Sequence, residues 1–198
     1  MTSDIIDRLA DVAPGSRVDG LRQRRAQART NSQASYDALF TAPDQTGVSR
    51  TERLAVATFV SSLHGAARAH DHYRGLLQAS AGRQVADMVD RVAAEGDTQG
   101  PYGRFPDSAD LRDEDSPGLV LSLDAAAADA LGERLTAAVQ HAHLLVLRPR
   151  ESSPKALAAL LSAGWSTPQV VTLSQLVAFL SFQLRVVHGL TVLKESNA

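Results

Sequence analysis

The hydrophobic positions of the chain recur with the period of an α-helix along most of its length. One such series runs from Val56 to Ala67 and another from Val170 to Val187, with apolar residues three or four apart. This spacing places side chains on one face of a helix, whereas strands need alternation at every second residue. Because such alternating runs are missing from the sequence, we predict an all-α fold of the helical-bundle type. The last helix is apolar on two sides, through Val170, Leu173, Val177, Leu180, Leu184 and Val187 and through Leu176, Phe179, Phe182 and Val186, which predicts that it is the central helix.

Capping boxes mark the starts of two helices. Ser49 is followed three residues later by Glu52, and Ser166 by Gln169. In this motif each side chain bonds the backbone N–H of the other residue, which satisfies two free donors of the first turn. The first box predicts a helix from about residue 50 into the seventies, and the second box begins the last helix.

Glycine and proline residues mark the remaining helix boundaries. Glycine adopts the left-handed conformation that ends many helices, and proline fits the first turn but not the interior. A helix rich in alanine is expected between Asp124 and Leu147. A short helix is expected to begin near Ser3, and the helical pattern after Ser49 should break at Gly82 and resume until near Gly96. Pro149 should stop the alanine-rich helix, and a further short helix should run from Ser153 and Pro154 to Gly164.

Two segments carry charge of opposite sign. Residues from Gly96 to Gly118 are rich in Gly, Pro and Asp, include six acidic residues, and should form a long loop rather than a regular helix. The segment from Arg17 to Arg29 holds five arginines against Asp19 alone. Without interleaved aromatic residues, these arginines suit a solvated helix face or an arm on an acidic neighbour better than phosphate binding. The loop from 96 to 118 thus serves in one of two ways: as the acidic neighbour of these arginines, or as a functional loop.

Composition limits the classes of protein that remain. The 198 residues suffice for a single domain, and 20 Lys and Arg against 22 Asp and Glu leave a net charge of −2, which gives no general attraction to nucleic acid. The chain has no cysteine, which excludes disulfides, thiolate metal sites and cysteine nucleophiles. We divide the expected domain, 1–198, into an N-terminal helical arm (1–48), a central helical region (49–95), the acidic loop (96–118) and the C-terminal helices (119–198).

A cytoplasmic location without membrane contact is the expectation from the two ends of the chain. The segment from Met1 to Leu9 has no apolar core of signal-peptide length. The segment from Val170 to Leu193 is long enough to span a bilayer, but it contains Arg185 and His188. An arginine near the middle of a span costs about 3 kcal/mol on insertion, so we interpret this segment as a buried helix of a soluble protein.

Six histidines are the first candidates for chemistry. His70 and His72 are two residues apart, as are His141 and His143, and such pairs point to different faces of a helix. We therefore expect no metal site and no cofactor. His64 and His188 lie in apolar stretches and are expected to be buried and neutral.

A second set of candidates combines acid–base groups with a cation. Glu52, His72 and Tyr73 fall on or at the ends of one predicted helix, and Arg185 and His188 share a face of another. A cation beside an imidazole can hold a carboxylate or a peroxide-like oxygen. The alternative is that Arg185 pairs with a carboxylate across a subunit contact. The sequence contains no phosphate-binding loop, serine elbow, zinc-protease motif or dinucleotide fingerprint.

The helix sequence ERLAVATFVSSLHGAARAHDHY resembles the active-site helix of the carboxymuconolactone decarboxylase and AhpD-like alkylhydroperoxidase superfamily. The final stretch, LLSAGWSTPQVVTLSQLVAFLSFQLRVVHGL, is similar to the closing pair of helices in that family. Together the two stretches cover a little over a quarter of the chain. The resemblance implies an all-α fold that assembles into homo-oligomers, often trimers or hexamers.

The residues that carry activity in that family are replaced here. Gly65 matches the family glycine, but the two cysteine positions fall on Ala66 and Ala69. The histidine position falls on Tyr73, with His72 one residue early, and the glutamate position falls on Leu54, two residues from Glu52. A thiolate attacks the peroxide in the active relatives, and an alanine methyl group has no such chemistry. Thiol peroxidase activity is therefore not expected.

Three hypotheses follow. The first is a non-peroxidatic family member that binds or assembles, as a homo-oligomer or with a CxxC-bearing relative, around an apolar pocket lined by Ala66, Ala69 and Leu54. The second is a redox-independent enzyme acting on a small organic acid or lactone, with His70, His72 or Tyr73 as acid–base groups and Arg185 as carboxylate clamp. The third is an unrelated all-α module. We also expect the small residues from 65 to 67 to allow close helix contact.

Overall fold

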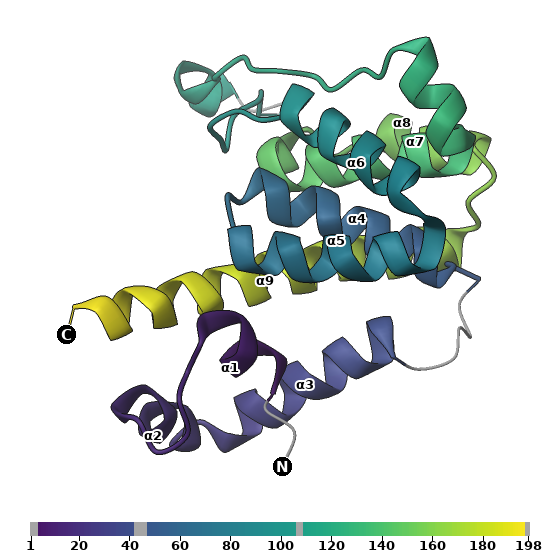
Figure 1. Cartoon of the computed structure of the whole chain (residues 1–198). Helices are drawn as coiled ribbons and strands as arrows, with labels where there is room; N and C mark the ends of the chain where they lie inside the picture. Colours follow the sequence, from purple (N-terminus) through teal and green to yellow (C-terminus); the bar gives the residue numbers. More distant parts are fainter. Residues whose placement is uncertain (1–3, 42–46, 106–108, 197–198) are drawn as a thin grey trace.

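The all-α fold is confirmed: the computed structural model describes residues 4–41, 47–105 and 109–196, which form nine α-helices and two short 3-10 helices and no strand (Figure 1). One isolated backbone bridge joins Gly103 to Ser116 in the acidic loop. The α-helices are α1 (Ile5–Ala10), α2 (Arg17–Gln23), α3 (Ala26–Phe40), α4 (Arg50–Leu63), α5 (Ala67–Ala81), α6 (Arg83–Glu95), α7 (Ala125–Leu147), α8 (Pro154–Ser162) and α9 (Thr167–Glu195), and the 3-10 helices are Ala109–Glu114 and Pro149–Glu151.

The central helix is α4, not the last helix as the apolar pattern predicted. α4 packs against α5, α6, α7 and α9, and every residue from 53 to 61 is buried. Phe59 lies on one side of α4, whereas Ala57 and Ser61 lie on the opposite side. Small side chains let neighbouring helices approach closely, so a helix with a modest apolar pattern can be buried all round.

The last helix, α9, is buried along one face only. Leu173 and Leu180 are fully buried, but Val171 and Phe182 are 51% and 47% exposed. α9 lies between the N-terminal helices and the rest of the bundle, against α1, α4 and α7 (Figure 1). It is also the one helix of the described residues that is long and apolar enough to cross a membrane, with 33% of its most apolar window buried.

The helix predicted from residue 50 into the seventies is broken at Gly65, which adopts φ 61°. This left-handed conformation ends α4 and lets α5 turn back along it, as Figure 1 shows. The expected close contact at residues 65 to 67 is wrong, because a Cβ on Gly65 would meet no atom within 4 Å and Ala67 is exposed. The break at Gly82 and the helix end before Gly96 are confirmed.

The predicted helix caps are confirmed at both capping boxes. The Ser49 hydroxyl accepts the Glu52 N–H at 3.2 Å, and Glu52 Oε2 accepts the Ser49 N–H at 2.8 Å. Gln169 Oε1 accepts the Ser166 N–H at 2.9 Å. Ser153 caps α8, and Gly164 follows its end with φ 86°. α1 begins after an Asp4 cap, and Ser3 lies outside the described residues.

The helix expected between Asp124 and Leu147 is present as α7 but is interrupted at Gly132. Its φ of 74° and ψ of 164° are not helical, so the axis bends there. Arg134, just past the bend, donates to Glu52 Oε1 at 2.9 Å and to the Gly164 carbonyl at 2.6 Å, and its guanidinium lies 4.3 Å from the Trp165 ring centre. The bend thus places Arg134 where it connects the first turn of α4, at Glu52, with the turn that precedes α9, at Gly164.

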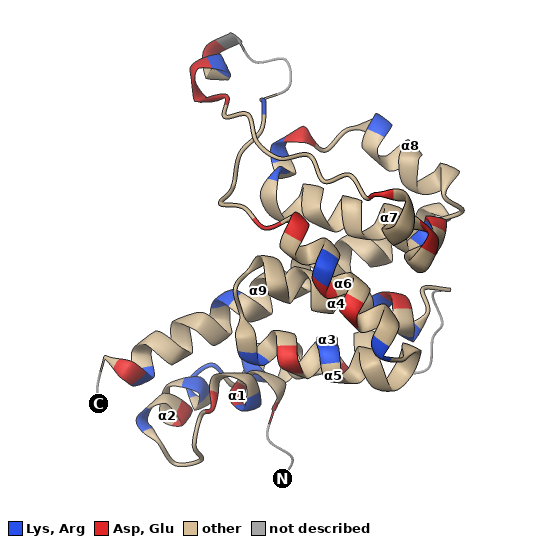
Figure 2. Cartoon of the chain, turned by 45° about the horizontal axis from the view of Figure 1, so that its top comes forward, with Lys and Arg blue, Asp and Glu red and all other residues tan. Residues whose placement is uncertain are grey.

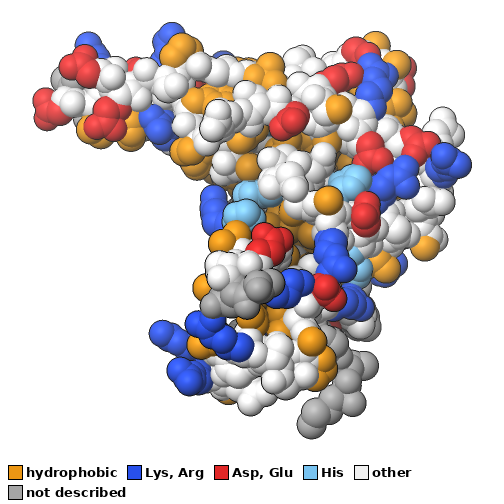
Figure 3. Space-filling view, turned by 60° about the vertical axis from the view of Figure 1, so that its left-hand side comes forward, with side chains coloured by type: hydrophobic (Ala, Val, Ile, Leu, Met, Phe, Trp, Pro, Cys, Tyr) orange, Lys and Arg blue, Asp and Glu red, His pale blue; other side chains and the backbone are white. Residues whose placement is uncertain are grey.

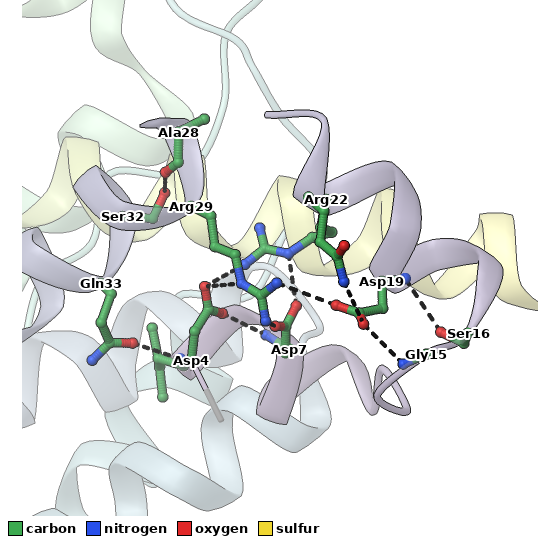
Figure 4. A network of polar contacts seen from close by, with 12 residues as sticks. Asp4, Asp7, Gly15, Ser16, Asp19, Arg22, Ala28, Arg29, Ser32 and Gln33 are labelled. Atoms are coloured by element: carbon green, nitrogen blue, oxygen red, sulfur yellow. Dashed lines mark hydrogen bonds and ion pairs between the residues drawn. The ribbon is translucent and has the colours of Figure 1, made fainter. Parts of the chain in front are cut away.

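The basic segment pairs with acidic residues of the N-terminal arm itself (Figure 4). Arg22 donates to Asp4 at 2.5 Å and to Asp7 at 2.6 Å, and Arg29 binds Asp7 and also Asp19, at 3.2 Å. The prediction that the basic segment packs on acidic residues is thus confirmed for Arg22 and Arg29. The prediction that the acidic loop supplies those residues is wrong. Figure 2 shows the loop projecting at the far side of the molecule from α1 and α2.

The segment from 96 to 118 forms no regular α-helix in its described part, as expected. It is tied to the body by Tyr102, whose N–H donates to the Leu147 carbonyl at 2.9 Å, and by Arg104, whose N–H donates to Glu151 at 3.0 Å. The Tyr102 hydroxyl also joins the two flanks of the loop, because it donates to the Leu119 carbonyl at 2.7 Å. Arg150 lies over the Phe105 ring at 4.2 Å. The described acidic residues from 110 to 115 therefore lie on a projection that these contacts hold, away from the α5–α9 pocket described next.

Candidate functional site

The turn between α4 and α5 borders a pocket of about 420 Å³ against α9, which we name the α5–α9 pocket. The face shown in Figure 3 is hollowed, with histidine and basic side chains around an apolar floor. The pocket is lined by Leu9, His64, Gly65, Ala66, Ala67, Arg68, Ala69, Leu184, Arg185, Val187, His188 and Thr191.

Ala66 and Ala69 line this pocket as predicted, but Leu54 does not, and the mostly apolar lining also includes charged residues. Leu54 is fully buried within α4. The pocket instead carries the guanidinium groups of Arg68 and Arg185, which give it positive charge. A pocket of this composition selects against cations and favours a negatively charged ligand.

The first turn of α5 adds to this positive character. Ala66 is the N-cap residue, and no side chain of the described residues caps the helix. The Ala67 N–H donates to the Gly65 carbonyl at 3.2 Å, but no described side chain accepts from the first turn, and the helix dipole places partial positive charge at the same end. Arg68 itself is 62% exposed and lies 3.7 Å from Asp11, which leaves it only loosely held.

Arg185 and His188 reach the pocket from α9, both with exposed side chains. Within the described chain Arg185 forms no hydrogen bond or ion pair, so the carboxylate partner considered above is not supplied by this protomer's described residues. His188 was expected to be buried, and its exposure contradicts that expectation. It faces outward because it follows Val187, which occupies the buried stripe of α9.

His64 is half-buried and lies at the edge of the pocket rather than deep in the core. Its Nε2 is 3.4 Å from the Ser181 hydroxyl. Burial, together with the Arg185 guanidinium, lowers the pKa of His64 below its usual range. The imidazole is therefore neutral near pH 7, and the positive charge in the pocket comes from the arginines. The fully buried histidines are His141 and His143, on α7.

The predicted acid–base residues do not share this pocket. Glu52 caps α4 and pairs with Arg134 at 2.9 Å. His70 Nε2 lies 2.8 Å from Asp90 on α6. Tyr73 is buried and donates to Gln183 Oε1 at 2.5 Å, and this burial raises the pKa of its hydroxyl. Each of these groups is held in the interior or in an ion pair.

His72 faces the N-terminal arm instead of the pocket. Its Nε2 is 2.9 Å from the Tyr36 hydroxyl and 3.4 Å from Arg8 Nη2. Arginine can only donate, so Nε2 is an acceptor here and the ring is neutral. Burial, reinforced by the Arg8 charge, lowers the pKa of His72 to about 4. His72 therefore fastens α1 and α3 to α5 through its neutral form.

The His72 contact predicts acid sensitivity. An unfolded histidine takes up a proton near pH 6.5, whereas folded His72 does so only near pH 4. The free energy of unfolding should thus decrease between pH 6.5 and pH 4, because the unfolded chain binds more protons there. His72→Gln should reduce this slope in urea unfolding at pH 7 and pH 4.5. The exposed control His188→Gln should keep the slope of the parent, and equal slopes in both variants would contradict the assignment.

The sequence pointed to Ala66, Ala69, Arg185 and His188 but did not predict that a helix begins at this pocket without a capping side chain. A usable signal was present: the residues from 64 to 67, HGAA, contain a glycine and no capping side chain. Among the described residues, no cluster of three or more His, Asp or Glu is arranged to hold a metal ion. No protein-family model, no curated protein and no solved structure matches this chain. The fold and the site define it as an all-α protein with a positively charged pocket at a helix N-terminus.

Proposed function

We propose that this protein binds a small organic anion in the α5–α9 pocket, as a non-peroxidatic relative of the superfamily that its sequence resembles. The observation that carries the proposal is Arg185, which has no acid partner in the described chain and lines the same pocket as the uncapped start of α5. A carboxylate there gains a charge-assisted hydrogen bond from the guanidinium and further donors from the first turn of the helix.

The replacement of the family cysteines supports a binding role. By the resemblance, the two cysteine positions are Ala66 and Ala69, which are the N-cap residue and the third residue of α5. A thiolate at these positions would be stabilised by the helix N-terminus. With methyl groups in their place, the same donors are left for an anion that enters from solution, and the chain has no sulfur nucleophile to react with it.

An acid–base enzyme is less well supported, because its general acid and base are engaged elsewhere. A proton-transfer group must come within hydrogen-bond reach of the substrate. His70, His72 and Tyr73 are instead bonded to Asp90, Tyr36 and Gln183 and do not line the pocket. Oligomer formation stays a prediction, which light scattering after size-exclusion chromatography would test, alone and with a CxxC-bearing relative.

Replacement of Arg185 tests the proposal directly. We expect benzoate or succinate, titrated by NMR, to shift the amide signals of residues 66–69 and 185–188. Arg185→Gln should weaken this binding about tenfold, since one charge-assisted hydrogen bond contributes about 1.5 kcal/mol. Arg83→Gln, at a side chain that is 79% exposed and distant in the fold, is the matched control and should leave the affinity unchanged. Unchanged binding in Arg185→Gln, or no shift at residues 66–69, would overturn the proposal.

A further inference from the structure

A second cavity, of about 800 Å³, lies between α7 and α9, and we name it the α7–α9 cavity. It shares two lining residues with the α5–α9 pocket, His64 and Arg185, so the two spaces adjoin at these side chains. A group that binds Arg185 from the α5–α9 pocket therefore borders a larger space. The other lining residues are Leu63, Thr98, Gln99, Gly100, Pro101, Leu145, Val146, Leu147, Pro149, Ser174, Val177, Ala178 and Ser181.

The wall that α9 contributes to this cavity is long and ends at the cation. Ser174, Ala178, Ser181 and Arg185 recur every three or four positions, so they lie on one face of the helix. At 1.5 Å per residue, the stretch from Ser174 to Arg185 is about 16 Å long. Because the first three side chains are small, they leave space along the wall. The guanidinium thus stands at one end of an elongated space.

The remaining walls of the α7–α9 cavity are mostly apolar. Arg185 is the one charged residue of this lining within the described chain, because His64 is neutral and no Asp or Glu lines either space. A mostly apolar cavity with a polar group that fixes orientation is typical of a ligand site. The lining therefore suits a molecule with a negative charge at one end and an apolar body. The aliphatic side chains come from Leu63, Leu145, Val146, Leu147 and Val177.

The wall formed by residues 98–101 is held against the end of α7. A Cβ on Gly100 would lie 2.8 Å from Leu147 Cδ2 and 3.3 Å from the Leu147 carbonyl oxygen, so a larger residue would push the segment away. The same carbonyl accepts the Tyr102 N–H at 2.9 Å. The cavity is therefore formed before a ligand enters, which avoids the cost of ordering a loop on binding.

We propose that the anion bound at Arg185 is a carboxylate with an aliphatic chain, and that the chain lies in the α7–α9 cavity. This inference rests on the function proposed above and adds the class of ligand. The carboxylate gains a charge-assisted hydrogen bond from the guanidinium, as any small acid would. Each methylene buried along the aliphatic walls adds to the affinity, so the cavity selects for the chain.

Three probes separate the role of the chain from that of the charge. In NMR titrations, butyrate should shift the amide signals of residues 66–69 and 185–188, and octanoate should also shift those of residues 145–147 and 178. Full burial of one methylene tightens binding about fourfold, so octanoate, with four more methylenes that are partly buried, should bind at least about tenfold more tightly than butyrate. Octanol, which has the same chain without the charge, should bind more weakly than octanoate, and equal binding would overturn the proposal.

Replacement of Ala178 narrows the cavity while Arg185 stays in place. Ala178 is exposed and lines the α7–α9 cavity but not the α5–α9 pocket. Ala178→Phe should weaken octanoate binding about tenfold, which reverses the gain from the chain. Butyrate binding should be unchanged in this variant, which reports that the fold and Arg185 are intact. Ala158→Phe, at an exposed position of α8 that lines neither space, is the matched control and should bind octanoate like the parent.

The outcomes distinguish this inference from the function on which it rests. If neither acid shifts the amide signals of residues 66–69, both proposals are wrong. If butyrate binds but octanoate binds no more tightly, the aliphatic chain does not lie in the α7–α9 cavity. The same conclusion holds if Ala178→Phe binds octanoate as well as Ala158→Phe does, and in both cases the binding of a small anion at Arg185 stands.

Discussion

Replacement of Asp7 by asparagine is expected to lower the free energy of unfolding by about 3 kcal/mol, because it removes the carboxylate charge from two arginine hydrogen bonds, each of which contributes about 1.5 kcal/mol. Among the described residues, Arg22 then keeps only Asp4 as a partner, and Arg29 keeps Asp4 and Asp19. Asp7 is 3% exposed and accepts from both Arg22 and Arg29. Asparagine has the same shape but no charge, so the loss reports the ion pairs rather than a cavity. Guanidinium unfolding followed by circular dichroism measures it.

Asp71→Asn provides the matched control for this variant. Asp71 is 82% exposed on α5, where the same change should alter stability by less than about 0.5 kcal/mol. A loss in Asp7→Asn as small as that of the control would mean that the ion-pair cluster of the N-terminal arm does not hold α1, α2 and α3 together.

Leu173→Ala should cost a similar amount, about 3 kcal/mol, through the cavity that it leaves in the core. Leu173 is fully buried on the inner face of α9, whereas Val171, two residues earlier, is half-exposed. Val171→Ala should therefore cost less than about 1 kcal/mol. The comparison separates the two faces of one helix.

Urea unfolding of both variants measures the difference. The sequence pattern alone predicted a helix buried on two sides, for which changes on opposite faces would be comparably costly. Equal losses in Leu173→Ala and Val171→Ala would show that the outer face of α9 is covered in solution, and the one-sided burial described above would be wrong.

The sequence was sufficient for the helices and their ends where local chemistry decides them. Ser49 and Glu52 form their capping box because the two side chains need only each other, and Pro154 fits the first turn of α8 because its ring fixes the backbone. The identity of the central helix could not be read in this way. Burial of Ala57 and Ser61 depends on which helices lie against α4, and small side chains carry little signal of their own.

The candidate site was predicted in part for the same reason. Ala66, Ala69, Arg185 and His188 line one pocket because Gly65 ends α4 and places the start of α5 beside this part of α9. The resemblance pointed to the two alanines, and the spacing of Arg185 and His188 on one helix face pointed to the other two residues. The predicted acid–base residues do not lie together, because each is bonded to a residue from a different and distant segment of the chain. Asp90 binds His70 across twenty residues, and Gln183 binds Tyr73 across more than a hundred. No local pattern in the sequence indicates such pairings.

The bend at Gly132 restricts how this chain can vary. Its backbone angles are almost confined to glycine, although a Cβ there would meet no atom within 4 Å. The free space around Gly132 therefore does not make substitution favourable, because a side chain would strain the backbone conformation itself. We therefore expect evolution to keep glycine at position 132 as long as the bend is needed to bring Arg134 to both Glu52 and Gly164.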